Sequence, residues 1–107
     1  MTKSVYVKSL ISSCENLLST AMAHFNNAQE NLMNDKIDFD NLYLSKFFLN
    51  VCIGETEILL EISSENPSLF EDKEREALET NLKKMKKNAN KVEEMLDYCR
   101  EQQTETH

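Results

Sequence analysis

A heptad pattern near the start of the chain limits its fold more than any other feature of the sequence. From Val7 to Leu32, apolar residues recur at alternating steps of four and three residues. They are Val7, Ile11, Cys14, Leu18, Ala21, Phe25, Ala28 and Leu32. Because an α-helix has about 3.6 residues per turn, this spacing places all of them on one stripe, which needs partner helices to cover it. The pattern predicts a helix over about 4–33 that packs into a bundle.

The composition favours an all-α fold in a single domain. Among 107 residues there are one Gly, one Pro and no Trp, too few turn-forming residues for a β-sandwich or barrel. The hydrophobic fraction of 40% and the charged fraction of 29% are those of a globular protein. We expect one domain over 1–102, followed by a frayed polar tail over 103–107.

A second helix is predicted over about 41–64, after an acidic connector that offers Asp40 as the N-cap. Its apolar residues lie on most sides of the helix, as expected for a helix packed between two others. The residues expected to face the core are Leu44, Phe48, Val51, Cys52, Ile58, Leu59 and Ile62. Gly54 weakens this helix by about 1 kcal/mol relative to Ala, which indicates a close approach of another backbone.

A third helix is predicted over about 68–102. Pro67 interrupts the preceding pattern, and Ser68 with Glu71 three residues later forms a capping box. A second heptad pattern follows, through Leu78, Leu82, Met85, Ala89, Val92, Leu96 and Cys99. The expected fold is therefore all-α, an up-down-up three-helix bundle with long, coiled-coil-like first and third helices.

The unequal helix lengths predict an overhang that binds another chain. Helices of about 30 and 35 residues run past a second helix of about 24, and folding the chain at its two turns sets the end of the first helix level with about position 91. The residues expected to project and to bind a partner are Val92, Met95, Leu96, Tyr98 and Cys99. The partner would be a second copy of the chain or a helix of another protein. In the alternative, Ile37, Phe39 and the start of the second helix close the overhang within one chain.

A stripe of like charge marks a second candidate for partner binding. Glu57, Glu61 and Glu65 recur every four residues in a helix whose single basic residue, Lys46, lies at the other end. Like charges at this spacing cost a few tenths of a kcal/mol per pair. The stripe is either a solvated face or a docking surface for a basic partner.

Catalytic, metal and cofactor sites find little support. His24 is the one histidine within a predicted helix, and a phosphotransfer role would need a lysine and a small residue close after it, whereas Phe25 and Asn26 follow. Folding the first hairpin about residue 37 leaves Cys14 about nine residues from the level of Cys52, or ~13 Å, too far for a shared zinc ion. The acidic connector lacks the ligand spacing, the glycine and the final glutamate of a calcium loop. We expect three free thiols, no metal and no cofactor.

Charge and hydropathy indicate the class of protein. A net charge of −7 argues against nucleic-acid binding, and the lysine run over 83–87 is balanced by nearby glutamates. No apolar run approaches the ~20 residues of a membrane span, and no secretory signal is recognised, so we expect a cytoplasmic protein.

The sequence favours a small acidic helical protein–protein interaction module, which would be an adaptor, a secretion-type chaperone or an inhibitor. The alternative is a structural or assembly subunit that forms a homodimer, and an enzymatic role ranks third.

Overall fold

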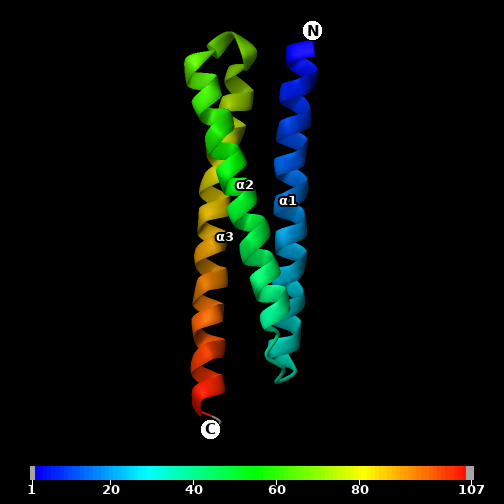
Figure 1. Cartoon of the computed structure of the whole chain (residues 1–107), viewed down its shortest axis with the longest axis vertical. Coiled ribbons are helices and arrows are strands. Elements are labelled where there is room, and N and C mark those ends of the chain that lie inside the picture. Colours follow the sequence, from blue (N-terminus) through cyan, green and yellow to red (C-terminus); the bar gives the residue numbers. More distant parts are fainter. Residues whose placement is uncertain (1, 106–107) are drawn as a thin grey trace.

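The protein is an all-α three-helix bundle, as the sequence predicts (Figure 1). The computed structural model describes the backbone of residues 2–105 and the side chains of residues 5–103, so the last two residues of the predicted frayed tail lie outside it. The elements are α1 (Thr2–Met33), α2 (Phe39–Glu65), the 3₁₀-helix η1 (Pro67–Leu69) and α3 (Asp72–Glu105). α3 extends to Glu105, three residues past the predicted end of the third helix.

The middle helix crosses obliquely over the other two (Figure 1). α1 and α3 run in the same direction, while α2 runs the opposite way, lying against α1 near its own start and against α3 near η1. The bundle is elongated, with extents of 58 × 18 × 16 Å. None of the helices described is both long enough and apolar enough to cross a lipid bilayer.

The connection between α1 and α2 is a tight, hydrogen-bonded turn. The Lys36 backbone N–H donates to the Asn31 carbonyl at 2.8 Å and the Asp35 N–H to the Leu32 carbonyl at 3.0 Å, which is the Schellman pattern of a helix end. Asp35 has φ 60°, a conformation that usually favours glycine. The N-cap of α2 is Asp38, because its carboxylate accepts from the Asn41 N–H at 3.0 Å, so the prediction of Asp40 as the cap is wrong.

The start of α3 also differs from the predicted one. Pro67, Ser68 and Leu69 form η1, which places Phe70 in the core before α3 begins at Asp72. The predicted capping box of Ser68 and Glu71 is therefore displaced by three residues. Glu74 Oε1 accepts from the Glu71 backbone N–H at 2.9 Å, which is the half of a capping box that the third helical residue supplies.

The buried stripe of α2 has small polar residues at three of its seven positions. It follows a heptad spacing and comprises Leu42, Ser45, Leu49, Cys52, Thr56, Leu59 and Ser63, which we call the inner seam. Of the residues predicted to face the core, Cys52 and Leu59 do so, whereas Leu44 and Ile58 are exposed. Short side chains let α2 approach both neighbouring helices closely, so packing geometry selects the buried face here in preference to hydrophobicity.

The register between α2 and α3 removes most of the predicted overhang. Thr56 Oγ1 lies 3.5 Å from Met85 Sδ, whereas folding the chain about residue 66 would set Thr56 level with about position 76. The difference arises because η1 and Phe70 lengthen the turn between α2 and α3. In addition, α2 starts two residues earlier than predicted and so covers more of α3. The expectation that Val92, Leu96 and Cys99 project from the bundle is wrong, because all three are buried. Only the end of α3 extends past the α1–α2 turn in Figure 1.

The buried position of Leu96 gives the first prediction. Leu96 is fully buried, so Leu96→Ala should lower the free energy of unfolding by about 2–5 kcal/mol, and Leu96→Asp should unfold most of the protein because it buries an unpaired carboxylate. Urea denaturation measures both. Tyr98→Ala is the matched control, since Tyr98 is 49% exposed and its removal should change stability by less than about 1 kcal/mol. A Leu96→Asp variant as stable as the Tyr98→Ala variant would contradict this packing.

The Asp38 cap predicts a pH dependence. The Asn41 backbone N–H, followed by the side chains of Asn41 and Asn31, lowers the pKa of the Asp38 carboxyl. A lowered folded-state pKa means that the cap's contribution is complete above the unfolded pKa of about 3.9 and is lost as pH falls through the lower folded value. Asp38→Ala should cost about 1 kcal/mol at pH 7, and the difference from the parent should shrink below about pH 4.

The matched control for the cap is Asp38→Asn, which keeps an acceptor for the Asn41 N–H but has no group to titrate. Its stability relative to the parent should therefore rise as the solution is acidified. Thermal unfolding followed by circular dichroism between pH 7 and pH 3 makes the comparison. A parent-to-Ala difference that stays constant over this range would show that the Asp38 charge contributes nothing.

Candidate functional site

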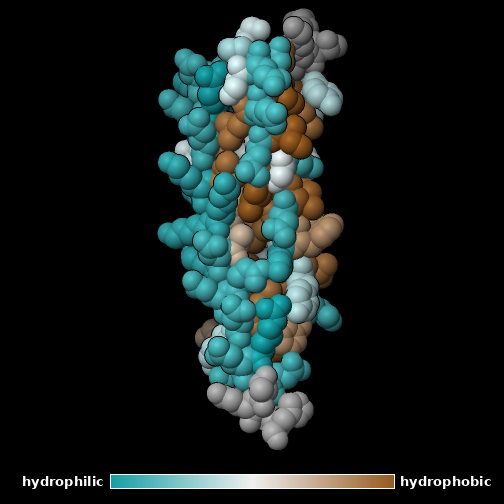
Figure 2. Space-filling model, turned by 60° about the vertical axis from the view of Figure 1, so that its left-hand side comes forward, coloured by the Kyte–Doolittle hydropathy of each residue, from teal (hydrophilic) through white to brown (hydrophobic). Residues whose placement is uncertain are grey.

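An apolar stripe runs along the solvent side of α2. Large apolar side chains recur there at heptad spacing, with Leu44 42%, Phe47 59% and Ile58 57% exposed. The stripe, which we call the outer seam, comprises Leu44, Phe47, Val51, Gly54 and Ile58. Figure 2 shows hydrophobic residues gathered along the side of the molecule formed by α2, beside a hydrophilic side formed by α3. Exposed apolar residues gathered in one strip make this side of α2 the candidate interaction surface of the described chain.

The outer seam lies directly opposite the core. At ~100° per residue, Phe47, Val51, Gly54 and Ile58 cluster around one direction of the helical wheel, and the inner seam clusters about half a turn away. α2 therefore carries two heptad stripes on opposite sides. The stripe that faces solvent carries Leu44, Phe47 and Ile58, and the buried stripe combines leucines with small residues.

Gly54 leaves a gap in the middle of the outer seam. A Cβ atom at this position would meet nothing within 4 Å, so no neighbouring backbone in the chain requires a glycine here. The prediction that another segment of the chain approaches Gly54 closely is wrong. Glycine within a helix costs about 1 kcal/mol relative to Ala, and its backbone conformation here is ordinary. The packing of this chain gives no reason for that cost.

A groove between α1 and α2 adjoins one end of the outer seam. It has a volume of about 270 Å³, and its walls are largely apolar. Its lining residues are Tyr6, Leu10 and Cys14 of α1 with Glu55, Ile58, Leu59 and Ile62 of α2. Tyr6 is exposed at its rim. Ile58 belongs to both the outer seam and the groove, so the two form one continuous apolar surface.

Carboxylates border the outer seam on both sides. On the helical wheel Glu57 and Glu61 lie on the α3 side and Glu55 on the α1 side, while Glu65 continues the line of the seam. Glu57 is 3.7 Å from Lys86 of α3, a loose and exposed contact that contributes little. Glu55 accepts a hydrogen bond from the Cys14 thiol at 3.4 Å. The predicted stripe of Glu57, Glu61 and Glu65 is fully at the surface, as a docking role requires.

Three of the five predicted partner residues of α3 lie in the core of the bundle. Val92, Leu96 and Cys99 are buried, Met95 is partly buried and Tyr98 is exposed. The alternative closure within one chain is what the structure shows, through Leu42 and Phe39 of α2, while Ile37 remains 37% exposed. These buried residues offer no surface for docking.

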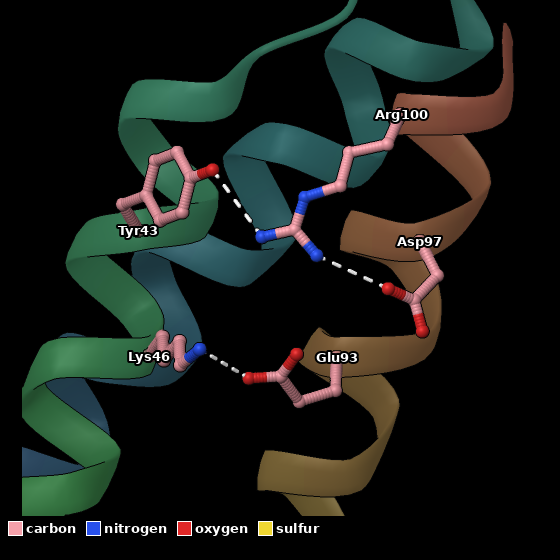
Figure 3. Close-up of polar contacts among 5 residues, drawn as sticks. All are labelled: Tyr43, Lys46, Glu93, Asp97 and Arg100. Carbon is pink, nitrogen blue, oxygen red and sulfur yellow. Dashed lines mark hydrogen bonds and ion pairs between the residues drawn. The ribbon is translucent and has the colours of Figure 1, made fainter.

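Polar contacts join the start of α2 to the end of α3 at the surface of the bundle (Figure 3). Lys46 Nζ lies 2.5 Å from Glu93 Oε1, and Arg100 donates to the Tyr43 hydroxyl at 3.3 Å and to Asp97 at 3.1 Å. The Lys46–Glu93 and Arg100–Tyr43 contacts link the start of α2 to the end of α3, and the Arg100–Asp97 pair lies within α3. The one lysine of α2 is therefore engaged within the chain.

His24 has a structural role. Its Nδ1 lies 2.7 Å from Asn41 Oδ1, and its ring stacks on Phe48 at 5.7 Å. Because the Asn41 amide nitrogen donates to Asp38, its oxygen is an acceptor, so His24 Nδ1 carries the proton and donates. A nitrogen already engaged in this way does not favour the phosphotransfer role considered from the sequence.

The three cysteines are free and buried. Cys14 donates to Glu55, three residues beyond Cys52, so Cys14 lies closer to the level of Cys52 than the predicted nine residues. The α1–α2 turn is tighter than assumed, which shifts the register of the hairpin. Within the described part of the chain, no group of His, Cys, Asp and Glu side chains is arranged to hold a metal ion.

Sequence reasoning missed the outer seam. It assigned Leu44, Val51 and Ile58 to the core because they are the more hydrophobic residues, and it gave Phe47 no role. A second signal was present, since Ser45, Cys52, Thr56 and Ser63 also follow a heptad spacing. Two heptad patterns on one helix indicate two packing surfaces, of which this chain covers one.

Burial of the thiols gives the third prediction. Burial raises the pKa of Cys14 and Cys99, and it raises the pKa of Cys52 to about 11. Since the thiolate is the reactive form, a chromogenic disulfide reagent at pH 8 should label the native protein far more slowly than a free cysteine. All three thiols should react at once in denaturant, which serves as the control. Fast labelling of two or more thiols in the native protein would contradict the buried packing.

Comparisons of the chain with protein-family models, with curated proteins and with solved structures gave no match.

Proposed function

We propose that the protein is an acidic helical protein–protein interaction module that docks a partner on the outer seam of α2. The observation that carries the proposal is the orientation of α2, which buries three small polar residues beside three leucines and turns Leu44, Phe47 and Ile58 to solvent. This orientation does not stabilise a monomer, because the large apolar side chains left in solvent contribute no free energy of burial. A partner that covers the outer seam would bury these side chains and gain that free energy on binding.

The proposed activity is binding, in the role of an adaptor, a secretion-type chaperone or an inhibitor. It includes a cytoplasmic location, which the three free thiols support because a reducing compartment keeps thiols in that state. Homodimer formation is the alternative, in which a second copy covers the same seam. The buried end of α3 no longer motivates such a dimer.

Site-specific photocrosslinking tests the proposal and is the fourth prediction. A photoreactive phenylalanine analogue placed at Leu44, in cells that make the protein, should yield a covalent adduct with a second polypeptide. The same analogue at Lys84, which is exposed on α3, is the matched control and should yield none. Mass spectrometry of the adduct distinguishes another protein from a second copy. Adducts that form equally from both positions, or from neither, would contradict docking at the outer seam.

Polar substitutions within the seam complete the test. Phe47→Ser and Ile58→Ser should abolish the Leu44 adduct and change the free energy of unfolding by less than about 1 kcal/mol, because both side chains are mostly in solvent. Leu49→Ser in the inner seam should instead destabilise the fold by several kcal/mol. A large loss of stability in Ile58→Ser would assign that side chain to the core.

A further inference from the structure

We infer that the occupant of the outer seam is an amphipathic α-helix that crosses α2 at Gly54 and carries lysine or arginine along its edges. The inference rests on the proposed function and specifies the chemistry of the partner. Three features of the described residues support it: the spacing of the seam, the gap at Gly54 and the carboxylates on both flanks.

The spacing of the seam matches a helix. Leu44, Phe47, Val51, Gly54 and Ile58 alternate in steps of three and four over about 21 Å, which is the pattern that receives the side chains of a second helix packed along the first. A β-strand repeats its side chains every second residue and would fall out of step with this stripe. The groove lined by Tyr6, Leu10 and Ile62 extends the same surface and can receive one further apolar side chain.

The gap at Gly54 fixes where the helix would cross. Glycine at the centre of a seam lets another backbone come close, since no side chain stands between the two helices. No atom of this chain would contact a Cβ placed there, so the space is open to an incoming partner. A larger side chain at position 54 should keep the free protein folded and obstruct the crossing.

The charges around the seam favour a basic partner. α2 carries five carboxylates, Asp40, Glu55, Glu57, Glu61 and Glu65, against one lysine. The lysine is paired with Glu93 of α3, and Lys86 reaches only Glu57, at 3.7 Å. A helix with cations on both edges would meet Glu55 on one side and Glu61 on the other.

A second copy of the chain is disfavoured by the same charges. Two copies meeting at their outer seams would bring two acidic helices together, and each chain carries a net charge of −7. Each α2 would offer its copy one lysine, which is already engaged. Self-association is therefore an outcome that the experiment must be able to detect.

A peptide-display selection on the purified protein tests the inference and is the fifth prediction. The library consists of helical peptides with a constant leucine stripe and flanking positions randomised among Lys, Gln and Glu. Selection should enrich Lys at these positions, and the affinity of a selected peptide should fall about tenfold or more as salt is raised from low to high concentration. Fluorescence anisotropy of the labelled peptide measures this affinity at each salt concentration.

Two variants locate the contact. Glu61→Lys should weaken the lysine peptide about tenfold, whereas Glu79→Lys on the exposed face of α3 makes the same charge change away from the seam and should weaken it far less. Gly54→Gln should also weaken binding about tenfold while raising the melting temperature of the free protein, because glutamine favours a helix more than glycine does. Gain of stability with loss of binding separates a docking role for Gly54 from a structural one.

The outcomes separate this inference from the proposed function. If no library peptide binds above background, the helical partner is overturned, and the Leu44 photocrosslink decides whether the docking function stands. If peptides bind and Ile58→Ser removes the binding, but Gln or Glu is enriched as often as Lys, the docking function stands and the basic partner is overturned. If sedimentation shows a dimer that Ile58→Ser converts to a monomer, the occupant is a second copy and the inference is again overturned.

Discussion

The close packing of α2 against both of its neighbours is the constraint on which the rest of the structure depends. α2 lies across α1 and α3, so its inner seam must fit between two helices at once. Ser45, Cys52, Thr56 and Ser63 keep that seam narrow, and Leu42, Leu49 and Leu59 fill the spaces between them. Alternation of small and large side chains in this way allows dense packing without voids.

Burying the hydroxyl groups of the inner seam costs free energy, and hydrogen bonds within the helix offset part of that cost. Thr56 and Ser63 donate to the carbonyls of Cys52 and Leu60 at 2.7 Å, so their hydroxyls are satisfied within the helix. Ser45 Oγ is buried and has no partner among the described side and main chains. An unsatisfied hydroxyl costs about 1–3 kcal/mol. The chain accepts this cost while leaving large apolar residues in solvent, which is why the outer seam is interpreted as a binding surface.

The two ends of α2 are held by different means. At its start, Asp38, Asn41, Asn31 and His24 form a hydrogen-bonded group that ties the first turn of α2 to α1. At its end, Arg75 of α3 donates to the Ser63 carbonyl at 3.2 Å. The middle of the helix, where the outer seam and Gly54 lie, has its inner side in the core and its outer side open. A partner could cover that side without displacing any contact that holds the bundle.

The sequence by itself determined the fold class, the number of helices and the heptad stripe of α1. These follow from local properties, namely the 3.6-residue period, the scarcity of Gly and Pro, and the break at Pro67. The burial of Val7, Cys14, Ala21, Phe25 and Ala28 confirms most of that stripe. A helix with a single apolar side can bury only that side, so the sequence pattern of α1 is sufficient to predict its buried face.

Only the tertiary structure decided the face of α2 and the register of α3. α2 has apolar residues on most of its sides, so hydrophobicity alone did not identify its buried face. The choice depended on how closely the neighbouring helices approach. The register depended on the length of the turn that contains η1 and Phe70, and an error of a few residues there turned Leu96 from a core residue into a predicted docking residue. The candidate site became visible only when both were known, because an outer seam is defined by what the core leaves uncovered.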